Sequence, residues 1–271
     1  MKLYKYETHL HTSQGSKCSW CSGAEQVENL KRCGYSGCFV TDHFFNGNTA
    51  VDRGLPWDVK VNLFCQGYED AKRRGDEIGI DVFFGWEYCY HGTEFLTYGL
   101  GKEFLLDYPQ INEMELNAYA ALVHRCGGFV VHAHPFREAG YLNTIRLYPR
   151  IVDGVEAENA SHLDPKFNDR AREYALSYSI PVTGGSDTHE FWDFPGGGIE
   201  VSEKISSPAD YLRLLRNGGI TRVLTRTDEY MTAQPPEREP VRPDISLLPS
   251  ELRKKAEDYY KLRSKIERKQ K

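Results

Sequence analysis

The fold class is indicated most clearly by the stretch Gly37-Cys38-Phe39-Val40-Thr41-Asp42-His43, in which an apolar run ends in an acid and a histidine. A short apolar run of this kind is typical of a strand buried on both faces of a parallel sheet. The residues before it predict a helix, since Ser22 stands three positions before Glu25 as in a capping box, and Gly34 follows as a terminator. A helix that leads into a buried strand is the repeating unit of an α/β fold.

The same alternation continues on both sides of this stretch. The apolar runs that predict strands cover residues 3–10, 37–41, 81–86, 95–100, 129–131, 154–158, 180–183 and 220–224. Between them we predict a helix over 58–78 that ends at Gly79, a second that opens at Asn112 with Glu115, and a third capped by Ser207. Seven or eight βα units in about 225 residues predict a mostly parallel barrel or barrel-like sheet with an outer ring of helices.

The C-terminal part of the chain differs in composition. Residues 232–243 are rich in proline and charge and predict a strap on the surface, whereas residues 247–271 predict a charged helix with a net-basic end. We therefore divide the chain into a main domain, 1–228, and an appended strap and helix, 229–271. The basic end is either a solvated helix face or a site for an acidic or phosphate-rich partner.

Composition limits the class of protein. A net charge of −5 over 271 residues gives no general basic field, so a small substrate is expected before nucleic acid, although the basic end leaves nucleic acid open. No apolar stretch has the roughly 18 residues that a membrane span requires, and residues 1–7 lack an apolar signal core. Seven cysteines, an odd number, indicate reduced thiols. We expect a cytoplasmic protein, and nothing indicates its oligomeric state.

Histidines and acids recur where predicted strands end. Six of the nine histidines lie at such an end or within a few residues of it. In a parallel α/β barrel these ends converge on one face, where active sites are built. The residues so placed are His9, His11, Asp42, His43, Glu87, His132, His134, Asp187 and His189.

Spacing within these groups predicts a metal centre. Residues two apart in a strand point the same way, so His9 projects with His11, His132 with His134, and Asp187 with His189. Any one pair is equally consistent with hydrogen-bonded core histidines. Five strand ends with such residues would bring together more titratable groups than a buried site holds without cations. Imidazole with carboxylate suits zinc, iron or manganese, and a shared carboxylate can bridge two ions.

Together, these motifs resemble those of the PHP family, named for polymerase and histidinol phosphatase. The matching motifs span about residues 1–225. They are His9-Leu10-His11-Thr12, Thr41-Asp42-His43, Gly85-Trp86-Glu87, Ala133-His134-Pro135 and Gly185-Ser186-Asp187-Thr188-His189. The resemblance implies a distorted (β/α)7 barrel with two or three divalent metals at the C-terminal ends of its strands.

The resemblance also implies which residues bind the metals. It makes His9, His11, Glu87 and Asp187 ligands around one or two ions, with Glu87 as the bridge. His134 would bind a further ion with Glu87, while His43 and His189 would complete the cluster. Glu156 is expected to support the site from outside it.

Two positions depart from the family pattern, and they favour two metals over three. The loop after His11 lacks the usual acid or histidine and holds Cys18 and Cys21 instead. These are two ordinary thiols, one unusual ligand or a redox pair. Glu94 stands where the family often has a histidine and is a candidate ligand, because carboxylate is also a hard donor.

Other residues have open roles. Asp42 and His132 are candidates for metal binding or for support of the ligands. His91 is a candidate at the mouth of the site. Arg137 is expected either to bind a substrate phosphate or to form a surface salt bridge. His124 and His162 receive no role.

We expect from this pattern a phosphatase that hydrolyses a small phosphomonoester of the histidinol phosphate, nucleotide or sugar phosphate type. A metal-activated hydroxide would attack phosphorus, and Asp187, His189 or His43 would transfer protons. The sequence contains neither a G-x-S-x-G motif nor a P-loop. The alternatives are a phosphodiesterase or nuclease of the same family and a metal-binding PHP domain without activity.

Overall fold

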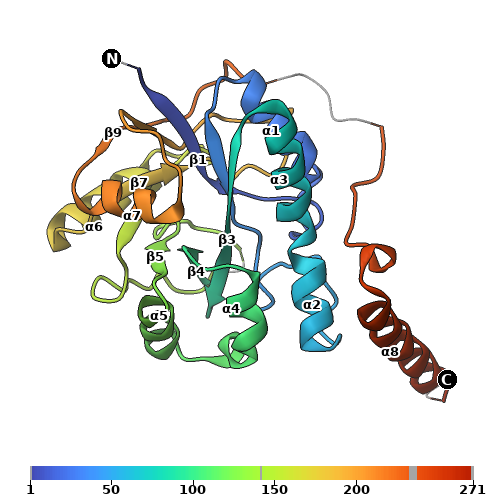
Figure 1. Ribbon diagram of the computed structural model, residues 1–271. Helices are drawn as coiled ribbons and strands as arrows, with labels where there is room; N and C mark the ends of the chain where they lie inside the picture. Colours follow the sequence, from blue (N-terminus) through green and yellow to red (C-terminus); the bar gives the residue numbers. More distant parts are fainter. Residues whose placement is uncertain (1, 141, 232–236, 270–271) are drawn as a thin grey trace.

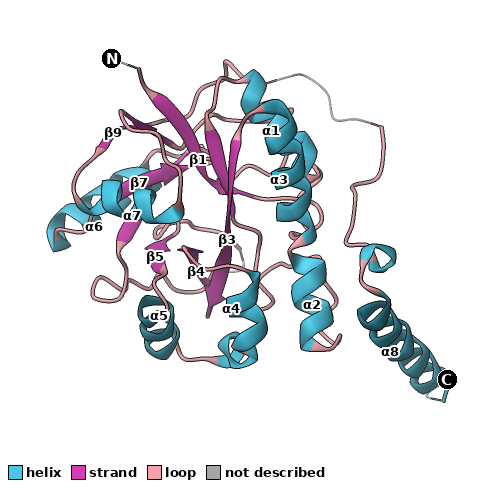
Figure 2. Cartoon of the chain, viewed as in Figure 1, coloured by secondary structure: helices cyan, strands magenta, loops and turns pink. Residues whose placement is uncertain are grey.

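A curved sheet of nine strands forms the centre of the computed structural model, which describes residues 2–140, 142–231 and 237–269. Helices surround this sheet on its outer side (Figures 1 and 2). The order of the strands across the sheet is β7-β6-β5-β4-β3-β2-β1-β8-β9. The strands are β1 (Tyr4–Leu10), β2 (Gly37–Val40), β3 (Asp81–Tyr90), β4 (Thr93–Tyr98), β5 (Phe129–His132), β6 (Gly154–Asn159), β7 (Val182–Gly185), β8 (Ile199–Val201) and β9 (Ile220–Val223).

The sheet curls into a nearly closed barrel. The end of β1 pairs with the segment that follows β7, through a parallel bridge between Leu10 and Thr188. Two backbone hydrogen bonds support this junction, from Asp187 N to His9 O at 2.9 Å and from His11 N to Thr188 O at 3.1 Å. The first and seventh strands therefore meet at the ends from which the sequence predicts metal ligands.

The prediction of a mostly parallel sheet is wrong for half of the strand pairs. The pairs β1–β2, β2–β3, β5–β6 and β6–β7 are parallel, but β3–β4, β4–β5, β1–β8 and β8–β9 are antiparallel. β3 extends to Tyr90 and returns as β4 through a tight turn at His91 and Gly92, both of which have positive φ. β8, only three residues long, has too short a pattern to predict.

The helices match the sequence best where a cap is strong. They are α1 (Gly23–Arg32), α2 (Trp57–Phe64), α3 (Gln66–Ile78), α4 (Lys102–Asp107), α5 (Leu116–Arg125), α6 (Lys166–Tyr178), α7 (Pro208–Arg216) and α8 (Ser250–Lys269), with 3₁₀ turns η1 (Pro109–Glu113) and η2 (Ile245–Leu247). The capping box of Ser22 and Glu25 is confirmed at α1, and the Ser207 cap at α7.

Two helix predictions are wrong in detail. The helix predicted over 58–78 is divided at Cys65 into α2 and α3. Just after the division α3 lies so close to the loop after β1 that a Cβ on Gly67 would be 2.0 Å from Thr12 Oγ1. The helix predicted from Asn112 starts later, because residues 109–113 form η1 and Glu115 precedes α5 without a side-chain cap.

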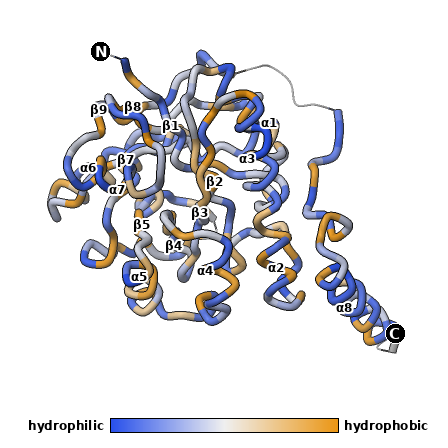
Figure 3. The backbone as a smooth tube through the Cα atoms, viewed as in Figure 1, coloured by the Kyte–Doolittle hydropathy of each residue, from blue (hydrophilic) through white to orange (hydrophobic). Residues whose placement is uncertain are grey.

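The C-terminal segment packs against the first half of the chain. α8 lies beside α2, where Lys255 forms an ion pair with Asp58 at 2.7 Å (Figure 1). Hydrophilic residues dominate α8, but apolar positions recur along it (Figure 3), and Ala256 is buried. Of the predicted strap, 232–243, residues 232–236 lie outside the described residues. Among the described helices, none is both long and apolar enough to span a membrane.

Candidate metal centre

Eight side chains that could hold a metal ion gather at the edge of the barrel towards which β1, β2, β3, β5 and β7 run and where β4 begins. Within the described residues they form four overlapping groups of three, and in each group the donor atoms lie within 4.8 Å of one another. Seven of the eight are buried, and His189 is half-buried. They are His9, His11, His43, Glu87, Glu94, His134, Asp187 and His189.

His9 and His11 each have one ring nitrogen occupied by a partner behind the cluster. His9 Nδ1 lies 2.9 Å from Glu156 Oε1, and His11 Nδ1 lies 2.9 Å from Ser16 Oγ. The Ser16 hydroxyl donates to Asp42 Oδ1 at 2.7 Å, so it accepts from His11. When neutral, as a metal ligand must be, both rings therefore carry their proton on Nδ1 and present a lone pair on Nε2.

These two lone pairs face each other. His9 Nε2 and His11 Nε2 are 3.1 Å apart, and Asp187 Oδ1 lies 3.4 Å from the first and 3.1 Å from the second. Two lone pairs and a carboxylate oxygen repel one another unless a proton or a cation lies between them. The donor set, two imidazoles and a carboxylate, fits a divalent ion such as zinc, iron or manganese.

Glu87 lies between the groups. Its Oε1 is 3.3 Å from His9 Nε2 and 3.1 Å from His134 Nε2, whereas its Oε2 is 2.6 Å from His43 Nδ1. Burial raises the pKa of Glu87, but His43 and His9 outweigh burial and hold it well below its usual range. Each oxygen of this ionised carboxylate thus faces a different set of imidazoles.

The contact between His43 and Glu87 is unusual for an apo pair. His43 Nδ1 and Glu87 Oε2 are both buried, and neither has a hydrogen-bond partner of good geometry among the described residues. Their separation of 2.6 Å is short, but the direction is wrong for a hydrogen bond. Two ligand atoms that share one ion have this relation.

Glu94 joins the cluster because of the hairpin. β4 runs antiparallel to its neighbours, so its first residues lie at the edge where β3 and β5 end. Glu94 Oε1 is 3.7 Å from His43 Nδ1, and Glu94 Oε2 is 3.6 Å from His134 Nε2. Burial and the nearby Glu87 charge raise the pKa of Glu94.

Two of the donors have strained backbones. His134 has φ of 26° and Asp187 has φ of 55°, a left-handed region that residues other than glycine rarely adopt. His134 N donates to Glu156 Oε2 at 3.0 Å, and Asp187 N donates to His9 O. Strain of this kind costs roughly 1–3 kcal/mol per residue and is concentrated at functional sites.

The prediction that His132 projects with His134 is wrong. β5 ends at His132, so His134 lies beyond the strand and the alternation of side chains no longer applies. The His132 ring stacks on Phe95 with centroids 5.0 Å apart, and it also contacts Tyr148 and Tyr174. Burial lowers its pKa to about 3. His132 is thus an apolar packing residue.

Two other candidates lie outside the four groups. Asp42 accepts hydrogen bonds from Thr12 N, Thr12 Oγ1 and Ser16 Oγ, and so it fixes the loop that orients His11. His91 is exposed on the turn between β3 and β4, with its ring against Tyr90. Neither brings a donor atom to the cluster.

Arg137 connects the cluster to the space in front of it. It forms an ion pair with Asp187 and donates to Ser161 Oγ at 3.2 Å. Burial raises the pKa of Asp187, but Arg137 and His9 outweigh burial and hold it well below its usual range. Arg137, Cys18 and His189 line two cavities, of about 670 Å³ and about 540 Å³.

Sequence reasoning missed two supporting residues, His162 and Ser16. His162 Nδ1 lies 2.8 Å from Asn168 Oδ1, and its Nε2 accepts from Arg137 Nε at 3.3 Å. Ser16 accepts from both His11 Nδ1 and His43 N. Both lie in loops, where spacing along the chain does not indicate direction, and no sequence signal could have found them.

The two loop cysteines have different surroundings. Cys21 is buried and accepts a hydrogen bond from Phe191 N at 3.2 Å. Cys18 is half-buried, and both cysteines are free thiols. Burial raises the pKa of Cys18, but its contacts with His189 and His43 outweigh burial and bring it to about 6.

Comparison with known proteins gives a family match over a short segment and a shared fold over most of the chain. The PHP-associated family matches residues 165–220. None of the curated proteins matches the chain. Among solved structures, it resembles a two-domain protein from Bacteroides vulgatus that contains a predicted PHP-like metal-dependent phosphoesterase, with TM-score 0.61 and 15% identity over 83% of this chain and 65% of that one. The chain thus spans less than two thirds of that relative.

Two further structures share the fold. PsfC from Pseudomonas syringae has TM-score 0.54 and 17% identity, over 78% of this chain and 88% of that one. The lesion-specific endonuclease PfuEndoQ from Pyrococcus furiosus has TM-score 0.56 and 11% identity, over 80% of this chain and 57% of that one. The family match is confined to residues 165–220, and over most of the chain these structures show similarity of fold.

Proposed function

We propose that the chain is a metal-dependent hydrolase of small phosphomonoesters. The observation that carries the proposal is the arrangement of His9 and His11, whose Nε2 lone pairs face each other beside Asp187 and Glu87. A divalent cation would relieve this arrangement while both rings keep their Nδ1 partners. The match of residues 165–220 to the PHP-associated family supports hydrolysis of a phosphoester as the reaction.

The donors divide naturally between two ions. His9, His11 and Asp187 form one group, and Glu87 and His134 belong to the next, in which His9 also lies. Since His9 has one lone pair, it would bind only one of the two ions. Glu87 would bridge them, since each of its oxygens faces different imidazoles, and Glu94 would complete the second group from β4. Bound divalent ions supply Lewis acidity and make a nucleophilic water available at neutral pH.

The protein's own groups would orient the substrate and move protons. Arg137 stands beside Asp187 at the edge of the larger cavity, where a guanidinium can bind a phosphoryl group through two donors. His189 lines both cavities and His43 lines the smaller one, so either can deliver a proton to a leaving oxygen. Asp187 would hold His189 in place, since its carbonyl oxygen lies 2.8 Å from His189 Nδ1.

The size of the space in front of the cluster favours a small substrate. A volume of about 670 Å³ is in the range of small-ligand pockets, and Phe167 and Leu163 give it an apolar side. The acidic side chains of Glu138, Asp164 and Asp193 line the same cavity. They disfavour a polyanion such as nucleic acid, in agreement with the net charge of −5.

One observation favours a phosphodiester as the second candidate substrate. The two cavities share Cys18, Arg137 and His189, so a phosphorus atom between them would have room for a substituent on either side. A phosphomonoester needs only one such space. The lesion-specific endonuclease among the structural neighbours has the same fold.

A panel of substrates tests the proposal. The full chain, loaded with zinc, iron or manganese, is assayed against nucleoside monophosphates, sugar phosphates, histidinol phosphate and simple phosphodiesters, with a chelator as control. We expect turnover of monoesters that the chelator abolishes. A preference for diesters would show that the substrate is a phosphodiester, and the proposed role of the metals would be unchanged. Metal binding without turnover of any ester would reduce the chain to a metal-binding domain.

A further inference from the structure

We infer that Arg242 is a positioning residue for the metal centre, and that it acts from the C-terminal part of the chain on the loop of residues 13–19. This loop lies between β1 and α1 and contains Ser16, whose hydroxyl orients His11. The inference rests on the proposed function, because it presupposes that the cluster binds divalent ions. It makes the metal affinity of the cluster depend on a segment that lies outside the barrel.

Three backbone carbonyl groups of the loop converge on one atom of Arg242. Arg242 Nη1 donates to the carbonyl oxygens of Ser13, Ser16 and Ser19 at 3.1, 3.3 and 3.4 Å. All three serines are buried. Carbonyl dipoles whose negative ends meet at one point repel one another, and a positive charge between them replaces this repulsion with charge-assisted hydrogen bonds. The guanidinium group therefore stabilises this conformation of the loop.

Contacts on both sides of Arg242 fix the segment that carries it. Before it, Arg238 forms an ion pair with Glu25 near the start of α1. After it, Asp244 N donates to Gln66 Oε1 at 2.7 Å, and Gln66 Nε2 donates to Asp244 O at 2.8 Å. The chain then continues into α8, which packs against α2 (Figure 1). Arg242 thus reaches the loop from a backbone that is held at both ends.

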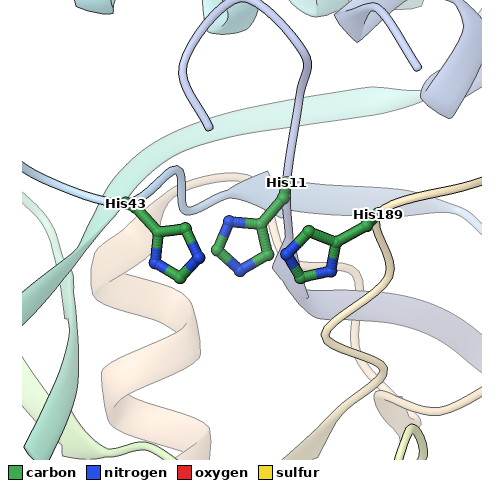
Figure 4. Close-up of side chains that lie close together, drawn as sticks. All are labelled: His11, His43 and His189. Carbon is green, nitrogen blue, oxygen red and sulfur yellow. The ribbon is translucent and has the colours of Figure 1, made fainter. Parts of the chain in front are cut away.

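Ser16 connects this loop to the donors of the cluster. Its Oγ accepts from His11 Nδ1 at 2.9 Å and from His43 N at 3.0 Å, and it donates to Asp42 Oδ1 at 2.7 Å. The His11 ring lies between the rings of His43 and His189, with its centroid 4.3 Å from each (Figure 4). A shift of Ser16 would therefore redirect the Nε2 lone pair of His11, and partners of this kind affect metal affinity strongly.

Arg242 shares the support of the loop with other contacts. Lys17 N donates to Asn48 O at 2.9 Å, and Ala50 N donates to Gly15 O at 2.8 Å. Arg242 is itself exposed, so a smaller side chain at this position leaves no cavity in the core. Its replacement should therefore preserve the fold and weaken metal binding without abolishing it.

The metal affinity of three variants of the full chain tests the inference. Arg242→Gln removes the charge and shortens the side chain, and we expect zinc to bind about 10-fold more weakly in competition with a metal-indicating dye. Arg242→Lys should keep most of the affinity, because an ammonium group has three N–H donors for the three carbonyl groups. Arg238→Gln is the matched control from the same segment. It should bind zinc as the native chain does, since its partner is Glu25.

Hydrogen exchange of the metal-free chain gives a second measurement that needs neither metal nor activity. The backbone amides of residues 13–19 should exchange at least about 10-fold faster in Arg242→Gln than in the native chain, because local opening of the loop becomes easier. The amides of β2 and β3 should keep their native rates. Arg242→Lys should restore slow exchange in the loop.

The outcomes separate this inference from the proposed function. If the native chain binds zinc and Arg242→Gln binds it equally tightly, the inference is overturned while the proposed function stands. Equal losses of affinity in Arg242→Gln and Arg238→Gln would also overturn it, because the segment would then act through general stability. If Arg242→Gln alone loses affinity but the native chain hydrolyses no ester, the inference stands and the proposed function is overturned. If the native chain binds no divalent ion, both are overturned.

Discussion

Two histidine pairs with the same spacing are oriented differently in the structure. His9 and His11 converge on one point with their Nε2 atoms 3.1 Å apart, whereas His132 and His134 separate. His134 faces Glu87 at 3.1 Å, but His132 is enclosed by Phe95, Tyr148 and Tyr174. The same H-x-H spacing therefore gives two facing imidazole nitrogens at one strand end and a single one at the other.

The difference lies in the backbone beyond the strand. After β1 the chain stays extended through His11, because it pairs with the segment after β7. After β5 the pairing ends with the hydrogen bond from Ala133 N to Glu94 O, and the chain turns at His134 with φ of 26°. That turn aims His134 at the cluster and places Arg137, whose N–H donates to His134 O, at the cavity. Strand spacing predicts direction only as far as hydrogen bonding extends the strand.

The largest expected effect comes from breaking the converging pair. His11→Ala removes a donor and leaves Ser16 Oγ without the imidazole that donates to it. We expect loss of bound metal by elemental analysis and a fall in hydrolysis of about 1000-fold, equivalent to about 4 kcal/mol in the barrier. His132→Phe is the matched control and should keep metal content and rate. Equal losses in both variants would contradict the division between the two pairs.

Removal of the carboxylate behind His9 should have the next largest effect. Glu156→Gln removes the charge that faces His9 Nδ1 and should weaken metal binding between about 10-fold and 100-fold. Glu158→Gln serves as the control, because Glu158 lies on the same strand but contacts Asn168 and Arg172. Competition with a metal-indicating dye measures both affinities. Unchanged affinity in Glu156→Gln would show that His9 is oriented by packing alone.

The buried His132 should make the metal-free protein sensitive to acid. Its folded pKa of about 3 lies below the ordinary value of 6.5, so below pH 6.5 the unfolded chain binds a proton that the folded chain does not. His132 does not affect the free energy of unfolding above pH 6.5. As the pH is lowered from 6.5 to about 3, its contribution makes the free energy of unfolding progressively smaller. At pH 5 the loss should be about 2 kcal/mol.

His132→Phe should remove this part of the acid sensitivity. Denaturant unfolding at pH 7 and pH 5, with chelator present throughout, compares the variant with the native chain. A loss of stability between these pH values that is the same in both proteins would refute the assignment of the proton to His132.

The smallest effect is expected at Arg137, which the turn at His134 positions. Arg137→Lys keeps a positive charge but loses the planar pair of donors. We expect the KM for the substrate to rise by about 10-fold and inhibition by inorganic phosphate to weaken by about 10-fold. The reduction in kcat should be smaller. Steady-state kinetics separates the two parameters. A change confined to kcat would place Arg137 in the chemical step.

The sequence predicted much of the donor set and less of the fold. Ligand-type residues at the ends of apolar runs indicated His9, Glu87 and Asp187, because a barrel brings such ends together. The antiparallel pairing of β4 could not be read from its pattern, although it carries Glu94 to the cluster. The tautomers set by Ser16 depend on contacts between loops, for which the sequence has no period.

We propose that the cluster binds at least two divalent ions and that these ions are required to hydrolyse a phosphomonoester. Stepwise addition of zinc, iron or manganese to the metal-free full chain, with phosphate release recorded at each addition, tests this. We expect negligible release without metal and a rate that rises until about two equivalents are bound. Phosphate release that is unaffected by removal of metal, or a saturated cluster that releases none from any monoester, would contradict it.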